Sequence, residues 1–103
     1  MNSRKTLQAI IDHYGADHQL AKAIEEQTEL IHVIARRLQL GESRWNLTDF
    51  YEELADVYVM LDQLKLIYCA EMSMTLGDLN DRLDSCRQEK LKRTIKRMQG
   101  ERQ

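Results

Sequence analysis

The 103-residue chain contains no proline and only four glycines, so few positions force its backbone to turn. The glycines stand far apart, at Gly15, Gly41, Gly77 and Gly100. Between them, apolar residues recur at the three- and four-residue spacing of helix faces. The sequence therefore predicts an all-α protein with a single domain over residues 1–103, and it argues against sheets with many turns.

Four helical segments fit this pattern. They cover roughly 4–13, 17–40, 49–71 and 75–99. Gly15 is expected to end the first and Gly41 the second. The expected N-terminal caps are Asp17 for the second helix, Asn46 or Thr48 for the third, and Thr75 with Asp78 as a capping box for the fourth.

The third segment is apolar almost all round. Between Leu54 and Ala70 its only charged residues are Asp56, Asp62 and Lys65. A helix of this kind is buried on several sides, and so small a chain offers little to bury it. We therefore expect a four-helix bundle completed by homo-oligomerisation, with residues such as Val57, Leu61 and Leu64 packing within or across subunits.

Charge and cysteine usage limit the expected binding partners and the expected cellular compartment. The formal net charge of −2 favours neither a nucleic-acid nor a membrane partner. The basic run at 87–102 reads first as a solvated helix end. Cys69 and Cys86 form no CxxC pair, which fits buried thiols in a reducing cytoplasm. The polar start argues against a signal peptide, and no apolar run approaches membrane-spanning length.

Carboxylates gather on the two central helices. Glu26 and Glu29 are three residues apart and share one helix face, as do Glu53 and Asp56. If the two helices pack antiparallel, as the short loop between them favours, the four carboxylates can converge, and they would then repel one another. A divalent cation relieves this repulsion, and oxygen ligands suit Mg²⁺, with Mn²⁺ as a substitute.

These motifs resemble those of the MazG-like, all-α nucleoside triphosphate pyrophosphohydrolase superfamily, of the short single-domain type. Its signature is ExxE, a spacer, then ExxD, and here it reads "EQTE" at 26–29 and "ELAD" at 53–56. The resemblance extends over about 19–98, most of the chain.

The resemblance implies Mg²⁺-dependent hydrolysis of a (d)NTP to a (d)NMP and pyrophosphate, in nucleotide-pool control or house-cleaning. Glu26, Glu29, Glu53 and Asp56 would hold the metal. Glu25 is the candidate for water activation, although helix geometry also allows it to be a ligand or a surface residue.

The resemblance also gives the basic residues a role. Lys90, Arg93 and Arg97 lie on one helical stripe that could bind the triphosphate, and Lys22 could do the same from one turn before ExxE. Members acting on uridine nucleotides tend to carry Asn four residues after the Lys. Thr94 at this position speaks against a dUTPase.

Other readings stay open. Glu29 and His32 form an ExxH unit of the di-iron carboxylate type, but the third helix lacks the second such unit. A non-catalytic, metal-binding helical module for dimerisation or regulation would explain the apolar third helix, but not Asp56.

Trp45, in the loop after Gly41, could stack on a base. Nucleic-acid binding by the basic run is disfavoured because aromatic residues are not interleaved with it.

Overall fold

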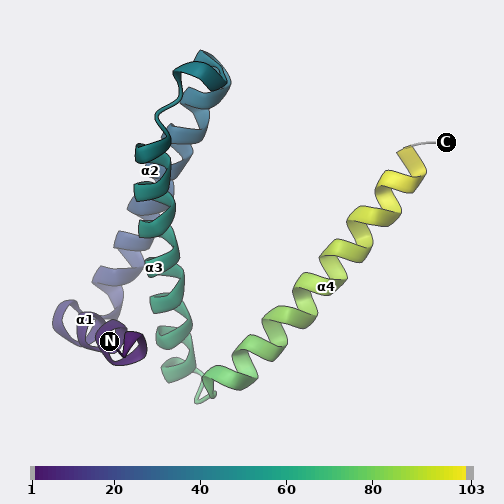
Figure 1. Cartoon of the computed structure of the whole chain (residues 1–103). Helices are drawn as coiled ribbons and strands as arrows, with labels where there is room; N and C mark the ends of the chain where they lie inside the picture. The colour runs from purple at the N-terminus through teal and green to yellow at the C-terminus, as the bar shows by residue number, and fades with distance from the viewer. Residues whose placement is uncertain (1, 102–103) are drawn as a thin grey trace. The chain divides into compact units, whose positions relative to one another are not determined.

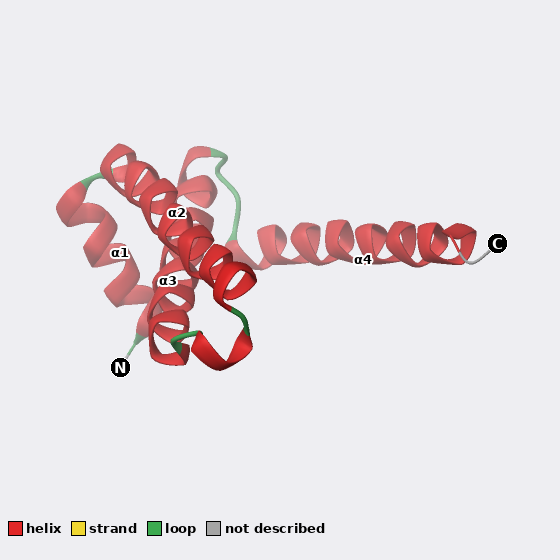
Figure 2. Ribbon diagram, turned by 90° about the horizontal axis from the view of Figure 1, so that it is seen from above, coloured by secondary structure: helices red, strands yellow, loops and turns green. Residues whose placement is uncertain are grey.

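The computed structural model describes residues 2–101, and over this range it contains helices and loops but no strand (Figures 1 and 2). The predicted all-α class with four helices is confirmed. The elements are α1 (Ser3–Tyr14), α2 (Ala16–Leu40), the short 3₁₀ helix η1 (Glu42–Arg44), α3 (Leu47–Glu71) and α4 (Leu76–Glu101).

The chain forms two compact units, Met1–Tyr68 and Cys69–Gln103. The first contains α1, α2, η1 and most of α3. The second contains the last turn of α3 and the whole of α4.

Most of the predicted turns and caps are found. Gly15 and Gly41 end α1 and α2 with φ of 91° and 81°, in a region that glycine alone adopts readily. Asn46 Oδ1 accepts a hydrogen bond from the backbone N–H of Asp49, and Thr75 Oγ1 accepts one from that of Asp78. The prediction for Asp17 was wrong.

The N-terminus of α2 has a different construction. The helix begins directly after Gly15, so Asp17 lies inside its first turn, and no side chain caps the helix. A carboxylate in the first turn still interacts favourably with the helix dipole, so the acidic residue keeps a local role without capping.

Helices α2 and α3 form an antiparallel hairpin (Figure 1). Gln19 near the start of α2 bonds to Gln63 near the end of α3, while Glu26 in the middle of α2 meets Asp56 in the middle of α3. The buried apolar side chains come from α1, α2 and α3: Ile11, Ala23, Val33, Val57, Met60, Leu66 and Ile67. The hairpin therefore provides the frame on which the facing carboxylates are held.

Only one face of α3 is buried. Val57 is buried and Leu64 is half-buried, but Leu61 is exposed, as are Tyr51 and Tyr58. The first unit thus leaves an apolar strip of α3 in contact with solvent, and the expectation that a second subunit covers this helix stays a prediction.

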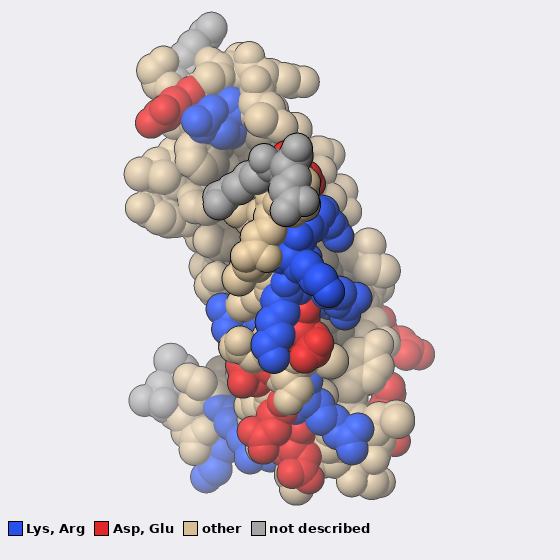
Figure 3. All heavy atoms as spheres, turned by 90° about the vertical axis from the view of Figure 1, so that its right-hand side faces the viewer, with Lys and Arg blue, Asp and Glu red and all other residues tan. Residues whose placement is uncertain are grey.

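In the second unit, α4 carries no buried residue. Asp78, Asp81 and Asp84 lie in its first half, whereas most of its Lys and Arg residues lie in the second half, together with Glu89 and Glu101 (Figure 3). Asp78 in the first turn interacts favourably with the helix dipole, whereas the last turn carries no Lys or Arg. None of the helices in the described range is long and apolar enough to cross a membrane.

Candidate metal centre

Three carboxylates of the two motifs meet between α2 and α3. Glu26, Glu53 and Asp56 each offer one oxygen, and these oxygens lie within 4.8 Å of one another. Helix geometry explains this meeting. Glu53 and Asp56 are three residues apart on α3 and share a face, and the antiparallel hairpin brings that face to Glu26 on α2. Three facing carboxylates match the oxygen ligation that Mg²⁺ and Mn²⁺ prefer.

Burial makes this cluster different from an ordinary acidic surface. Glu26 is only 8% exposed. Its Oε2 and the Oε2 of Glu53 are buried and have no hydrogen-bond partner among the described residues. A buried carboxylate oxygen without a partner costs free energy, so these two atoms fit a site that a cation completes.

Glu29 stands beside the cluster. It lies outside the group of oxygens within 4.8 Å, but it influences the pKa of Glu53. The pKa of Glu53 is raised, first by burial, then by the hydrogen bond to Glu29, and further by the negative charges of Glu29, Asp56 and Glu26. The carboxyl group of Glu53 therefore holds its proton more firmly than a free glutamic acid does.

Lys22 is the cation that lies nearest on α2. Its Nζ is 3.2 Å from Glu26 Oε1 and 3.4 Å from Glu25 Oε1. The hydrogen bond to Glu26 is the main reason that the pKa of Lys22 is raised, followed by the negative charge of Glu25. Lys22 thus neutralises part of the cluster, and Glu25 lies at its rim with a largely exposed side chain.

The remaining predicted residues lie elsewhere. Lys90, Arg93 and Arg97 are exposed on α4, in the second unit, and their role in phosphate binding stays a prediction. Thr94 donates its hydroxyl hydrogen to the carbonyl oxygen of Lys90. His32 is exposed and is not in the carboxylate group, so within the described residues the ExxH reading gains no support.

A pocket of about 440 Å³ opens directly beside the carboxylates. Four charged residues line one part of it: Lys22, Glu25, Glu26 and Asp56. This volume lies within the range that holds a small-molecule ligand. The pocket therefore places a ligand-sized space against the candidate metal ligands.

The other part of the pocket is aromatic and amide-lined. Tyr14 and His18 stack with ring centroids 5.0 Å apart and planes 15° apart, on either side of the turn at Gly15. Beside them, Gln19 Nε2 donates to Gln63 Oε1 at 2.7 Å, and Gln63 Nε2 contacts Met60 Sδ at 3.7 Å. The 2.7 Å contact between His18 Nδ1 and Gln19 Oε1 ties the imidazole to this buried pair.

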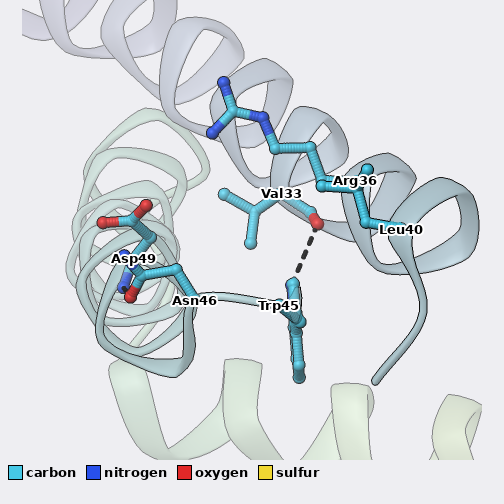
Figure 4. A pocket seen from close by; sticks show the side chains of 6 residues that line it. All are labelled: Val33, Arg36, Leu40, Trp45, Asn46 and Asp49. Atoms are coloured by element: carbon cyan, nitrogen blue, oxygen red, sulfur yellow. Dashed lines mark hydrogen bonds between the residues drawn. The ribbon is translucent and has the colours of Figure 1, made fainter. Parts of the chain in front are cut away.

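A second cavity, of about 230 Å³, lies at the closed end of the hairpin (Figure 4). The indole of Trp45 forms one wall, and its Nε1 donates to the carbonyl oxygen of Val33. Arg36 and Leu40 extend from α2 and Asp49 from α3. None of the three clustered carboxylates lines this cavity.

Sequence reasoning missed the aromatic pair and Gln19 as parts of this pocket, and Gln63 as the buried partner of Gln19. A signal for the glutamines was present: Gln19, Ala23, Glu26 and Val33 follow the spacing of the buried face of α2, and Gln63 falls on the buried face of α3 with Met60 and Ile67. For the rings no local signal exists, because their stacking depends on the φ of Gly15.

Comparison with known proteins adds no relative: no family model, no curated protein and no solved structure matches the chain.

Proposed function

We propose that this protein is a metal-dependent nucleoside triphosphate pyrophosphohydrolase, which cleaves a (d)NTP between the α and β phosphates to give a (d)NMP and pyrophosphate. The observation that carries the proposal is the buried carboxylate of Glu26, with an oxygen that lacks a partner, facing Glu53 and Asp56 at the edge of a ligand-sized pocket. The resemblance of the two motifs to the MazG-like signature supports the reaction class.

Glu26, Glu53 and Asp56 would hold Mg²⁺ or Mn²⁺, with Glu29 close to Glu53. Such an ion, when bound, neutralises phosphate charge and lowers the pKa of coordinated water. The all-oxygen donor set and the two unpartnered oxygens fit it.

The chain's own groups then have separate tasks. Water attacks the α phosphorus, the bond from that phosphorus to the bridging oxygen breaks, and pyrophosphate leaves. Glu25, at the rim of the pocket, accepts the proton that the water loses. Lys22, whose Nζ lies 3.2 Å from Glu26 Oε1 at the pocket, would donate to the triphosphate. Lys90, Arg93 and Arg97 are the proposed further phosphate contacts.

The exposed apolar strip of α3 favours assembly of this chain into a homo-oligomer. The same strip would also suit a non-catalytic helical module that binds metal. Turnover separates the two functions, since the module would bind the cation without releasing pyrophosphate.

The test is to incubate the protein with each common NTP and dNTP, with and without Mg²⁺, and to identify the products. Monophosphate and pyrophosphate that form only with metal are expected. Glu53→Gln and Asp56→Asn should abolish this release, whereas the control Glu52→Gln, at an exposed neighbour on α3, should retain it. Equal turnover in all three variants would refute the metal site.

A further inference from the structure

We propose that Tyr14 and His18 form the nucleobase end of the pocket, where the base stacks on the ring of Tyr14 and its edge donates an N–H to His18 Nε2. This inference rests on the proposed function and deepens it, because it assigns the part of the substrate that the phosphate chemistry does not touch. The pocket that holds the rings also holds Glu26 and Asp56, so a single ligand reaches both ends.

The two rings are suited to stacking. Their planes are nearly parallel, and Tyr14 is 55% exposed although His13 also packs against it with ring centroids 4.6 Å apart, so part of its ring is accessible to a planar ligand. Aromatic side chains bind bases through such faces with little dependence on sequence. The turn at Gly15, with φ of 91°, brings the end of α1 back over the start of α2 and thereby places both rings on the pocket.

The buried glutamines set the hydrogen-bonding direction of His18. Gln19 is 4% exposed and uses its Nε2 to donate to Gln63, so its Oε1 faces the imidazole. An amide oxygen only accepts, and His18 Nδ1 must therefore carry the proton in the 2.7 Å contact. In the neutral ring this leaves Nε2 as an acceptor, which suits an amino or ring N–H of a base.

The arrangement of the amides supports this tautomer. Gln63 Nε2 points to Met60 Sδ, a weak acceptor. Turning both amides over would set Gln63 Oε1 against that sulfur, two acceptors together, and would lose the contact. The contacts from Met60 to His18 thus favour the arrangement in which Gln63 Nε2, Gln19 Nε2 and His18 Nδ1 are the donors.

The second cavity is the competing location for a base, because it offers the indole of Trp45. It lacks Glu26, Glu53 and Asp56, so a base there would lie in a different cavity from the metal ligands. This is why the geometry points to the rings of Tyr14 and His18.

Calorimetry with two probes tests the proposal. The first is a set of nucleoside triphosphate analogues with a methylene group between the α and β phosphates, and the second is inorganic tripolyphosphate, both with Mg²⁺. Tyr14→Ala and His18→Ala should each weaken analogue binding by roughly tenfold and leave tripolyphosphate binding unchanged. Tyr14→Phe keeps the ring and should bind as the wild type does. His18→Phe keeps a ring without the acceptor and should recover only part of the loss.

Arg36→Ala, in the second cavity, is the matched control and should change neither affinity. If Arg36→Ala weakens analogue binding while Tyr14→Ala and His18→Ala do not, the base lies in the second cavity and the proposal is wrong. Equal losses for both probes in the ring variants would also overturn it, since the rings would then act on the phosphates or the fold. If wild type binds neither probe with Mg²⁺, the proposed function itself fails.

Nitrogen NMR of His18 gives an independent result. We expect a protonated Nδ1 in the free protein and a shift of the Nε2 resonance on binding the analogue, with no such shift for tripolyphosphate. An Nε2–H tautomer in the free protein would contradict the proposed hydrogen bond.

Discussion

Gln19 Nε2 donates a 2.7 Å hydrogen bond to Gln63 Oε1 in the interior of the α2–α3 hairpin, where Gln63 is only 2% exposed. The two amides join residues 44 positions apart. They fix which turn of α3 faces which turn of α2, because a shift of either helix would leave both amides buried and unpaired. The facing of Glu26 and Asp56, two turns further along each helix, depends on the same alignment.

Removing one member of this pair should cost more than removing both. Gln19→Leu leaves the Gln63 amide buried without its partner, and we expect a loss of about 1–3 kcal/mol in the free energy of unfolding. The double variant Gln19→Leu/Gln63→Leu should recover part of that loss, since two apolar groups then face each other. Urea denaturation of the wild type, both single variants and the double variant measures the coupling. Strictly additive losses would show that the pair does not act as a unit.

The carboxylate cluster could be predicted because its causes are local. Residues at i and i+3 share a helix face, and a short connection favours antiparallel packing of adjacent helices, so ExxE and ExxD could be expected to face each other if both helices formed. The structure brings together Glu26, Glu53 and Asp56 and leaves Glu29 just outside. This finer ranking depends on side-chain rotamers, which the spacing does not specify.

Long-range features could not be predicted in the same way. The bond between Gln19 and Gln63 depends on the exact alignment of two helices, and the stacking of Tyr14 on His18 depends on the backbone at Gly15. The predicted cap of α2 was wrong for a related reason. The helix begins directly after Gly15, so Asp17 lies inside the first turn and is not at the N-cap position. Local propensity identifies where a helix starts more reliably than which atoms complete its end.

Glu53→Gln should stabilise the metal-free protein while weakening its response to metal. Burial and neighbouring negative charges raise the pKa of Glu53, so its ionised form is disfavoured, and the amide removes that charge while its N–H can still donate to Glu29. We expect the Tm without metal to rise and the increase in Tm on adding Mg²⁺ to shrink. Mg²⁺ affinity should fall at least tenfold, which is roughly the loss of affinity seen when a residue that supports a metal site is removed.

Scanning calorimetry with EDTA and with Mg²⁺ makes both measurements. Glu52→Gln removes the same charge from an exposed position on α3 and should change neither result much. A lower Tm for Glu53→Gln without metal would contradict the repulsion inferred from the geometry.

The metal-free protein should gain stability as the pH falls from neutrality. The folded-state pKa of Glu53 lies above its ordinary value of 4.5, so the folded protein holds this proton more firmly than the unfolded chain does. That contribution is complete below the unfolded pKa and is lost as the pH rises through the raised folded pKa. Lys22 does not titrate in this window, since its pKa is raised from 10.5.

The measurement is the difference in unfolding free energy between wild type and Glu53→Gln at several pH values in EDTA. The difference should favour the variant most at neutral pH and shrink on acidification. Other groups titrate in both proteins and largely cancel. A difference that does not vary with pH would mean that Glu53 has an ordinary pKa.

Gly15→Ala should destabilise the first unit through its backbone alone. Gly15 has φ of 91° and ψ of 151°, a region that only glycine adopts readily, and a Cβ there would meet no atom within 4 Å. We expect a cost of about 1–3 kcal/mol in the free energy of unfolding. Gly77→Ala is the control, because Gly77 lies in the helical backbone of α4 and a Cβ there would make only an ordinary contact with Thr75. This variant should not lower the helicity. The two variants are compared by urea denaturation and circular dichroism; equal behaviour would show that φ at Gly15 is not limiting.

Lys22→Gln should separate metal binding from phosphate binding. In the metal-free structure the Nζ of Lys22 lies 3.2 Å from Glu26 Oε1, so the ammonium group competes with a cation for that carboxylate. Without it, we expect Mg²⁺ to bind about two- to fivefold more tightly, the scale of a partly exposed ion pair. Binding of Mg²⁺-tripolyphosphate should weaken, because a donor to the phosphates is lost.

Lys92→Gln, which removes a lysine paired with Glu89 on α4, is the control for net charge and should leave Mg²⁺ affinity unchanged. Calorimetric titration of each variant with Mg²⁺ and then with tripolyphosphate gives both affinities. If Lys22→Gln weakens Mg²⁺ binding, Lys22 supports the geometry of Glu26 and does not compete with the metal for it.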